Sequence, residues 1–381
     1  MMLLIRNAQV YAPAYLGKKD VLISSGRIEY IADKIEMGPL PCKEIDAKGL
    51  RLIPGLIDQH VHITGGGGEG GFATRTPEIQ LSELILGGIT TVVGLLGTDG
   101  TTRSLENLYA KTMALNEEGV TAYMMTGAYC YPGPTITGDP GNDIVFCEKI
   151  LGAKLALSDH RSSNISSREL IELASKTRLA GMLSGKPGMV ILHMGSGKNG
   201  LQPVFDALEN SDIPVGIFRP THVGRSKRLR KEAWDLLKLG GYADYTCSSR
   251  KPGGPSARIA NAIARDIPTE HITVSSDGHG SWSTYDDAGN LLEIGVSDVG
   301  CMLRELRFMV CETQLPLELA LTFFTSNVAS ALGLAGRKGV IQEHADADIL
   351  LLDENLQLQT VIAKGELLMH DGSLLKKGTY E

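Results

Sequence analysis

The segment Leu56–His62 ends in two histidines, His60 and His62, that stand two residues apart. The apolar residues before them predict a buried β-strand that starts after Pro54-Gly55. Because side chains alternate between the two faces of a strand, both imidazoles would point to the same side at its carboxyl end. Neutral imidazole is a common ligand of zinc and similar metals. The spacing alone is weak evidence, so a metal site also requires ligands further along the chain.

Other side chains that could bind a metal stand where further strands are predicted to end. They are His193, His222 and Asp277. A single buried histidine is more often a core residue with a satisfied hydrogen bond than a ligand. Four histidines and an aspartate at matching strand ends, however, supply enough nitrogen and oxygen ligands for two metals.

Lys154 lies within the predicted strand 153–158. A lysine inside a barrel strand either extends its ammonium group to solvent or is buried with a lowered pKa. An uncharged amine can react with carbon dioxide, and the resulting carbamate has two oxygens that could bridge two cations. Taken alone, the sequence favours the outward orientation.

The order of the predicted elements favours a (β/α)8 barrel of the TIM type. Strands are predicted at 56–62, 90–96, 122–127, 153–158, 189–194, 215–220, 243–247 and 273–276. Amphipathic segments between them predict helices, within 77–88, 104–119, 167–185, 200–210 and 225–240. Eight strands with intervening helices close naturally into a barrel, whereas a doubly wound sheet is the competing α/β arrangement. In such a barrel the active site forms at the carboxyl ends of the strands.

Both ends of the chain contain short β-branched segments separated by turns. Residues 1–53 and 336–381 are therefore predicted to build one small β-sandwich module together. Residues 54–335 are predicted to form the barrel.

The composition excludes several classes of protein. The 381 residues carry a net charge of −7, which argues against nucleic acid or an anionic membrane surface as a partner. No apolar run reaches the roughly 18–20 residues that span a bilayer. The cysteines form no CxxC pair, and we expect no signal peptide, so a cytoplasmic protein with reduced thiols is predicted.

Three charged residues near the predicted strand ends suggest a small zwitterionic ligand. Glu69 follows four consecutive glycines, and Arg161 and Arg225 stand just after two of the predicted strands. One carboxylate and two guanidinium groups would match a molecule with one amine and free carboxylates. Exposed ion pairs are the alternative for both arginines. The glycine run lacks the Gly-Lys-Ser/Thr of a phosphate-binding loop.

Taken together, the Leu56–His62 segment, the strand lysine, the later histidines and the aspartate resemble the metal-dependent amidohydrolase superfamily. Within it, the chain resembles isoaspartyl (β-aspartyl) dipeptidases. The segments that carry this resemblance are 65–69, 97–99, 126–129, 158–161, 220–223 and 275–278.

The resemblance implies a binuclear zinc site, although ligands of this type also accept other divalent metals. His60, His62 and Asp277 would hold one ion, and His193 and His222 the other. A carbamate on Lys154 and a hydroxide would bridge the two ions, and the hydroxide would attack the amide.

The resemblance also implies roles around the metals. Asp277 would transfer the proton to the leaving amine, and Tyr129 would help to stabilise the oxyanion. Glu69 would bind the amino group of the substrate, and Arg161 and Arg225 its carboxylates. Hydrogen bonds to the substrate would come from Gly67, Thr98 and Ser281.

The predicted function is hydrolysis of β-aspartyl dipeptides, in a symmetric homo-oligomer. The alternative enzyme is another amidohydrolase, acting on a cyclic amide such as a dihydropyrimidine or hydantoin, or on an N-acyl amino acid. A non-catalytic scaffold protein on the same fold is the alternative from a different class. Such relatives have lost their metal ligands, whereas this chain retains all of them.

Overall fold

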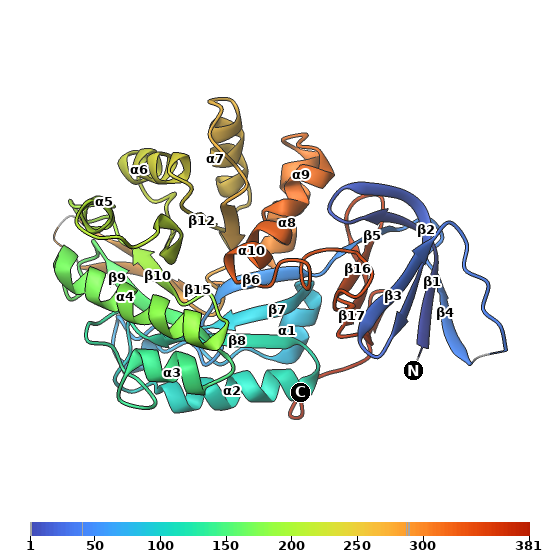
Figure 1. The fold of residues 1–381 in the computed structure, drawn as a ribbon, viewed down its shortest axis with the longest axis horizontal. Helices are drawn as coiled ribbons and strands as arrows, with labels where there is room; N and C mark the ends of the chain where they lie inside the picture. The colour runs from blue at the N-terminus through green and yellow to red at the C-terminus, as the bar shows by residue number, and fades with distance from the viewer. Residues whose placement is uncertain (1, 40, 287, 289) are drawn as a thin grey trace.

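The computed structural model describes residues 2–39, 41–286, 288 and 290–381, and it shows a barrel beside a β-module (Figure 1). The barrel strands of this described part are β6 (Leu56–Val61), β7 (Ile89–Gly94), β8 (Thr121–Gly127), β9 (Ile150–Leu157), β10 (Met189–Met194), β11 (Phe218–Thr221), β12 (Ala243–Thr246) and β13 (Ile272–Ser275). Strands β6 to β11 form one parallel sheet in chain order, and β12 pairs in parallel with β13.

Backbone hydrogen bonds close the two seams between these sheets. The amide of Val223 donates to the carbonyl of Asp244 at 3.2 Å, and the amide of His62 donates to the carbonyl of Gly278 at 2.8 Å. The strands therefore follow a closed ring, and the predicted (β/α)8 barrel is confirmed. The barrel strands are buried on both faces, so their sequences are almost continuously apolar. The few polar residues within them are therefore candidates for a function.

The prediction of the sixth strand was wrong in its first half. Val215–Ile217 is a 3-10 turn that follows Pro214, and β11 begins only at Phe218. The amide of Ile217 donates to the carbonyl of Pro214 at 3.0 Å, which closes the turn. The apolar residues here therefore belong to a turn, although their composition is typical of a strand.

In the described residues the helices are α1 (Leu81–Leu86), α2 (Leu105–Glu118), α3 (Pro140–Phe146), α4 (Ser167–Ser184), α5 (Gln202–Glu209), α6 (Lys227–Lys238), α7 (Gly254–Ile263), α8 (Cys301–Cys311), α9 (Leu317–Thr322) and α10 (Ser326–Ala331). The two long predicted helices end as expected, with Gly119 and Gly185 as left-handed C-caps at φ 119° and 67°. Within the ranges that the structure describes, no helix has both the length and the apolar character needed to cross a membrane.

The β-module joins strands from both ends of the chain. Its strands are β1 (Met2–Tyr11), β2 (Tyr15–Ser24), β3 (Arg27–Ala32), β4 (Cys42–Asp46), β5 (Arg51–Pro54), β16 (Ile349–Leu352), β17 (Leu358–Ala363), β18 (Glu366–His370) and β19 (Ser373–Leu374). Strand β5 pairs antiparallel with β16, so the N-terminal and C-terminal segments share one sheet, as predicted for this module.

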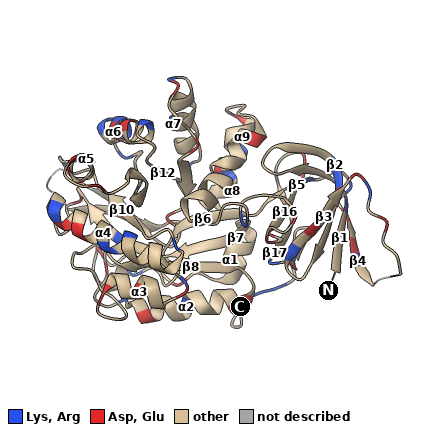
Figure 2. Cartoon of the chain, viewed as in Figure 1, with Lys and Arg blue, Asp and Glu red and all other residues tan. Residues whose placement is uncertain are grey.

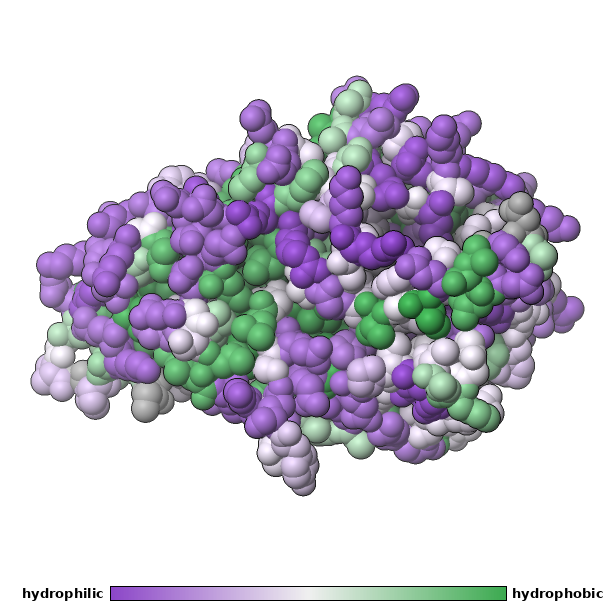
Figure 3. All heavy atoms as spheres, turned by 180° about the vertical axis from the view of Figure 1, so that it is seen from behind, coloured by the Kyte–Doolittle hydropathy of each residue, from purple (hydrophilic) through white to green (hydrophobic). Residues whose placement is uncertain are grey.

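A hairpin of β14 (Ser281–Tyr285) and β15 (Leu291–Val296) follows the last barrel strand. Charges of both signs lie on the outer helices α4 and α6 (Figure 2). Seen from behind, the surface is largely hydrophilic with hydrophobic areas between (Figure 3). Polar residues that are buried rather than exposed are therefore the ones that need an explanation.

Candidate active site

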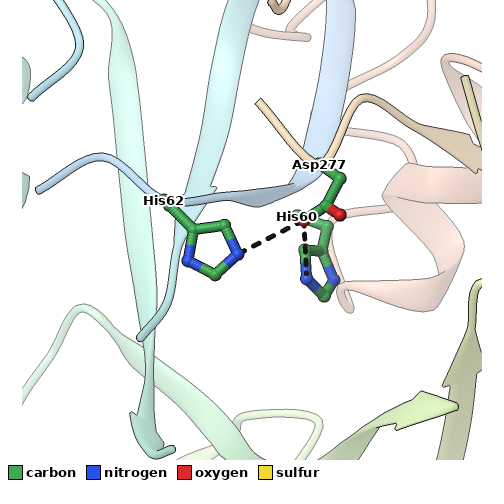
Figure 4. Close-up of side chains that lie close together, drawn as sticks. All are labelled: His60, His62 and Asp277. Carbon is green, nitrogen blue, oxygen red and sulfur yellow. Dashed lines mark ion pairs between the residues drawn. The ribbon is translucent and has the colours of Figure 1, made fainter. Parts of the chain in front are cut away.

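Two histidines and an aspartate meet at the carboxyl end of the barrel. His60 lies in β6, His62 follows that strand, and Asp277 follows β13, which closes the ring next to it. His62 Nε2 lies 3.2 Å and His60 Nε2 3.6 Å from Asp277 Oδ1 (Figure 4). One ligand atom from each of the three lies within 4.8 Å of the others, so they could hold one metal ion.

His222 adds a third imidazole to this group. Its Nε2 lies 3.9 Å from Asp277 Oδ2, while its Nδ1 contacts the Thr246 hydroxyl at 2.6 Å. His222 and Asp277 both have a positive φ, 63° and 55°, which is uncommon for residues other than glycine. Backbone strain of this kind is typical of functional sites, where the surrounding structure holds a side chain in a required direction.

His193, near the end of β10, lies beside His222 with 4.5 Å between the ring centroids. Its Nδ1 is 2.6 Å from the Tyr129 hydroxyl, and its Nε2 is 3.3 Å from Asp159 Oδ2. The structure thus brings His193 to the same wall as the other histidines, with its ring nitrogens facing Tyr129 and Asp159.

Lys154 points into the barrel, contrary to the outward orientation that the sequence alone favoured. Its side chain is almost fully buried, and its Nζ lies 2.9 Å from His60 Nε2. Burial lowers the pKa of Lys154 to about 7, so much of the amine is uncharged near neutral pH. The lysine on the fourth strand therefore belongs to the histidine–aspartate group.

The donor set fits divalent metal ions. Burial holds the pKa of His60, His193 and His222 well below the ordinary histidine value, so they are neutral, as a ligand must be. Among the described residues His222 Nε2, which faces Asp277 Oδ2, is buried without a hydrogen-bond partner. Buried polar atoms are rarely left without a partner, and a metal or its water would provide one.

Glu69 bonds to three of the other predicted substrate-binding residues. Its Oε1 accepts hydrogen bonds from the Thr98 hydroxyl and from Arg161 Nη1, both at 3.1 Å. Its Oε2 accepts from the Ser281 hydroxyl at 2.8 Å. Gly67 lies in the loop before it at φ 75°, where a Cβ would stand 2.4 Å from the Thr74 carbonyl, so only glycine fits.

Asp159 links the two arginines and is a residue that the sequence analysis missed. It accepts from Arg161 Nε and Nη2, both at 2.9 Å, and lies 3.7 Å from Arg225 Nη1. Although burial opposes ionisation, hydrogen bonds from His193 and Arg161 hold the pKa of Asp159 well below its usual range. Its sequence signals were its place just after a predicted strand and within the segment 158–161 that carries the family resemblance, but no role was predicted for it.

Arg103 is a second residue that the sequence analysis missed. It is buried, and its guanidinium donates to the carbonyls of Thr64, Gly66 and Thr76, which fixes the shape of the glycine-rich loop. No motif pointed to Arg103, because its role depends on a loop that is distant in the sequence.

A single cavity of about 910 Å³ contains the open side of these groups. The predicted site residues in its lining are His62, Gly67, Glu69, Thr98, Tyr129, Arg161, His193, His222, Arg225, Asp277 and Ser281. His60 and Lys154 lie beneath this lining and contact each other, and His60 also lies next to Asp277. A pocket with convergent charged groups and several perturbed pKa values is the expected form of an active site.

Comparison with known proteins agrees with this geometry. A family model for the amidohydrolase family matches residues 220–368. The chain shares 42% identity with a β-aspartyl dipeptidase from Fervidobacterium islandicum, solved in complex with the dipeptide β-Asp-Leu, at a TM-score of 0.95 over 98% of this chain and 97% of the other.

Two more distant matches are a structure and a partial sequence match. A dihydropyrimidinase from Brevibacillus agri is 17% identical with a TM-score of 0.64, over 99% of this chain and 97% of the other, which shows a shared fold. A dihydroorotase of Elusimicrobium minutum is 39% identical over 110 residues, which is 28% of this chain and 24% of that protein. The chain thus matches about a quarter of the length of that dihydroorotase.

The barrel and the buried group of histidines, lysine and aspartate define a hydrolase of the amidohydrolase class. With 42% identity over nearly the whole of both chains, the protein belongs to the β-aspartyl dipeptidase family of that class.

Proposed function

We propose that the protein hydrolyses β-aspartyl dipeptides at a binuclear metal centre. The observation that carries this proposal is the set of contacts around Glu69, which unites a carboxylate, two hydroxyls and Arg161 beside the candidate metal ligands. A β-aspartyl dipeptide has one free amine and two free carboxylates, so it complements Glu69, Arg161 and Arg225 in charge. The related enzyme solved with β-Asp-Leu supports the same substrate class.

The proposed metals are two zinc ions, with other divalent metals able to use the same ligands. His60, His62 and Asp277 would hold one ion, and His193 and His222 the other. When bound, the ions would lower the pKa of a shared water towards about 7, which makes a hydroxide available to attack the amide carbonyl, and they would polarise that carbonyl.

Lys154 is proposed to carry a carbamate, whose two oxygens would be available as further ligands for the ions. Its buried, largely uncharged amine is the form that reacts with carbon dioxide, and its position 2.9 Å from His60 Nε2 is next to the first ion's ligands. The carbamate would turn the buried amine into an anion and so balance the charge of the cations.

The remaining chemistry belongs to side chains of the chain itself. Asp277 would accept the proton of the attacking water and deliver it to the leaving amine, since its carboxylate faces the open cavity. Burial raises the pKa of Tyr129, so its hydroxyl stays protonated and could donate a hydrogen bond to the developing oxyanion. Asp159 would hold Arg161 in the direction needed to bind a carboxylate.

A direct test compares turnover of β-linked and α-linked Asp-Leu by metal-replete enzyme. We expect turnover of the β-linked form and little of the α-linked form. A Glu69→Gln variant should lose at least about 100-fold in kcat/KM for β-Asp-Leu, because a charged hydrogen-bond partner of the substrate amine is lost from a largely buried position. The exposed Glu78 provides a matched control, since Glu78→Gln should leave turnover unchanged.

The alternatives give different results in the same assay. An enzyme for cyclic amides would open a hydantoin or dihydropyrimidine faster than it cleaves β-Asp-Leu, and it would tolerate Glu69→Gln. A non-catalytic scaffold would contain well below one equivalent of metal when purified without chelator. The predicted homo-oligomer rests on the family resemblance, and the predicted cytoplasmic location rests on the sequence alone.

A further inference from the structure

Arg258 lines the same cavity but has no place in the chemistry described above. It lies in α7, and its guanidinium rests against the backbone of Gly224, next in the chain to Arg225. A Cβ at Gly224 would stand 2.7 Å from Arg258 Nε, so the absence of a side chain at Gly224 leaves the room that the guanidinium occupies. The position places Arg258 on the wall next to one of the proposed carboxylate-binding arginines.

Arg258 differs from the other arginines of the cavity in having no partner. Arg161 binds Asp159 and Glu69, and Arg225 donates to the Met194 carbonyl at 2.6 Å. Arg250 pairs with Glu293 at 3.2 Å and lies over the Trp282 ring. Within the described part of the chain, Arg258 makes neither a hydrogen bond nor an ion pair, and its Nε is buried without a partner.

The surroundings of Arg258 favour an anion. It is about half buried, and its pKa is lowered first by burial and then by the nearby positive charge of Arg230, which the smaller opposing influences of Tyr245 and Glu305 do not cancel. A half-buried cation beside a like charge is unfavourable unless an anion binds to it. Because an arginine fork is suited to two parallel hydrogen bonds with a carboxylate, a carboxylate is the anion that fits best.

We propose that Arg258 binds a carboxylate on the side chain of the leaving residue, so that the enzyme prefers β-aspartyl dipeptides whose C-terminal residue is acidic. This inference rests on the proposed function. A β-aspartyl dipeptide whose leaving residue has an uncharged side chain has two carboxylates, for which Arg161 and Arg225 suffice. The third carboxylate, present in β-Asp-Glu, would remain for Arg258. Pockets of roughly 300–1,000 Å³ hold drug-sized ligands, so the cavity of about 910 Å³ has room for the longer residue.

The test compares β-Asp-Glu with β-Asp-Gln, which have nearly the same shape and differ in one charge. We expect the wild-type kcat/KM to favour β-Asp-Glu by about tenfold, mostly through KM, which corresponds to about 1.4 kcal/mol. In Arg258→Gln the ratio of the two kcat/KM values should fall close to one. Arg258→Lys keeps the charge and should retain part of the preference, and added salt should weaken it.

Arg265 gives a control outside the cavity, because it is exposed and bonded to Asn261. Arg265→Gln should keep the wild-type ratio. A wild-type ratio near one, or a ratio unchanged by Arg258→Gln, would overturn the inference while turnover of β-Asp-Gln still supports the proposed function. Loss of turnover for every β-aspartyl dipeptide would instead refute the proposed function itself.

A longer β-aspartyl peptide could offer its terminal carboxylate to the same arginine. Comparing kcat/KM for the tripeptide β-Asp-Leu-Gly and for its C-terminal amide tests whether Arg258 binds this terminal carboxylate. If Arg258→Gln removes a preference for the tripeptide acid over the amide and leaves the ratio of β-Asp-Glu to β-Asp-Gln unchanged, the assignment to the leaving residue's side chain is wrong.

Discussion

Among the residues that the structure describes, two lysines are buried, at opposite ends of the barrel, and their surroundings differ. Lys338 lies where the β-module meets the barrel, and its Nζ contacts Asp348 at 2.6 Å, Asp346 at 3.0 Å and the hydroxyl of Thr121, the first residue of β8, at 2.7 Å. Lys154 lies at the carboxyl end of the barrel. Within the described ranges, no carboxylate lies within 4.0 Å of its Nζ.

The two environments shift the pKa of the lysines in opposite directions. Burial opposes the charge of Lys338, yet the carboxylates of Asp348 and Asp346 raise its pKa. At Lys154 burial dominates and lowers the pKa to about 7. The comparison shows that a buried lysine paired with carboxylates keeps its charge and can join the β-module to the barrel. A buried lysine without such partners instead has a largely uncharged amine near neutral pH, which is the reactive form.

The largest expected effect follows from removing the amine of Lys154. Lys154→Met should lower kcat/KM for β-Asp-Leu by at least about 1,000-fold, which is about 4 kcal/mol, because the proposed anion between the metals would be lost. In metal-free protein near neutral pH the free energy of unfolding should rise, since a buried and uncompensated amine is replaced by an apolar side chain of similar length. Kinetics, metal analysis and urea unfolding of the same preparation measure these quantities.

A companion variant separates a missing anion from a distorted site. Lys154→Ala leaves space at this position, and added short carboxylic acids should restore part of its activity. Full activity in Lys154→Met would show that a carbamate is not needed.

Removing Lys338 should have the converse effect. Lys338→Met leaves two carboxylates without their buried cation and should lower the free energy of unfolding by about 3–5 kcal/mol, measured by urea unfolding. Below its unfolding temperature the variant should keep the wild-type kcat/KM, because Lys338 lies far from the carboxyl ends of the strands. In the double variant Lys338→Met/Asp348→Asn part of the stability should return, since one unpaired carboxylate is removed as well.

If Lys338→Met lost activity while it remained folded, the two ends of the barrel would be coupled, and the contrast between the lysines would not hold. If Lys338→Met had the same free energy of unfolding as the wild type, the ion pairs around Lys338 would make no net contribution to stability.

The comparison also explains what the sequence could and could not predict. The barrel followed from eight buried apolar runs separated by amphipathic helices, because both signals are local. His60 and His62 were predictable because a strand places residues two apart on one face. The direction of Lys154 was not, because its contact with His60 depends on β6, which lies three strands away from β9 in the sheet.

Residues that act through long-range contacts were beyond the sequence. Asp159 holds Arg161, two residues away, but its contacts to His193 and Arg225 require β10 to lie beside β9 and β11 to lie beside β10. Arg103 donates to three backbone carbonyls of a distant loop, which no motif describes. Val215–Ile217 has the composition of a strand, and the turn that follows Pro214 overrides it.

The smallest effect, the pH dependence of stability, tests the opposite pKa shifts directly. In metal-free protein without carbon dioxide, the pKa of Lys154 is about 7 in the folded state and near the ordinary 10.5 in the unfolded state. Between these values the unfolded state binds more protons, so the free energy of unfolding should rise with pH by up to about 1.4 kcal/mol per unit from this residue. Lys338 has a raised pKa, so its stabilisation is complete below 10.5 and constant in this window.

Urea unfolding at pH 7.5 and 8.5 therefore distinguishes the two lysines by slope. Lys154→Met should lose this rise of stability with pH, and Lys338→Met should retain it on a lower baseline. Because both variants keep all other titratable groups, the difference in slope between each variant and the wild type isolates one lysine. The same slope in wild type and Lys154→Met would mean that the amine of Lys154 is charged in the folded barrel, and the reactive amine on which the carbamate depends would be absent.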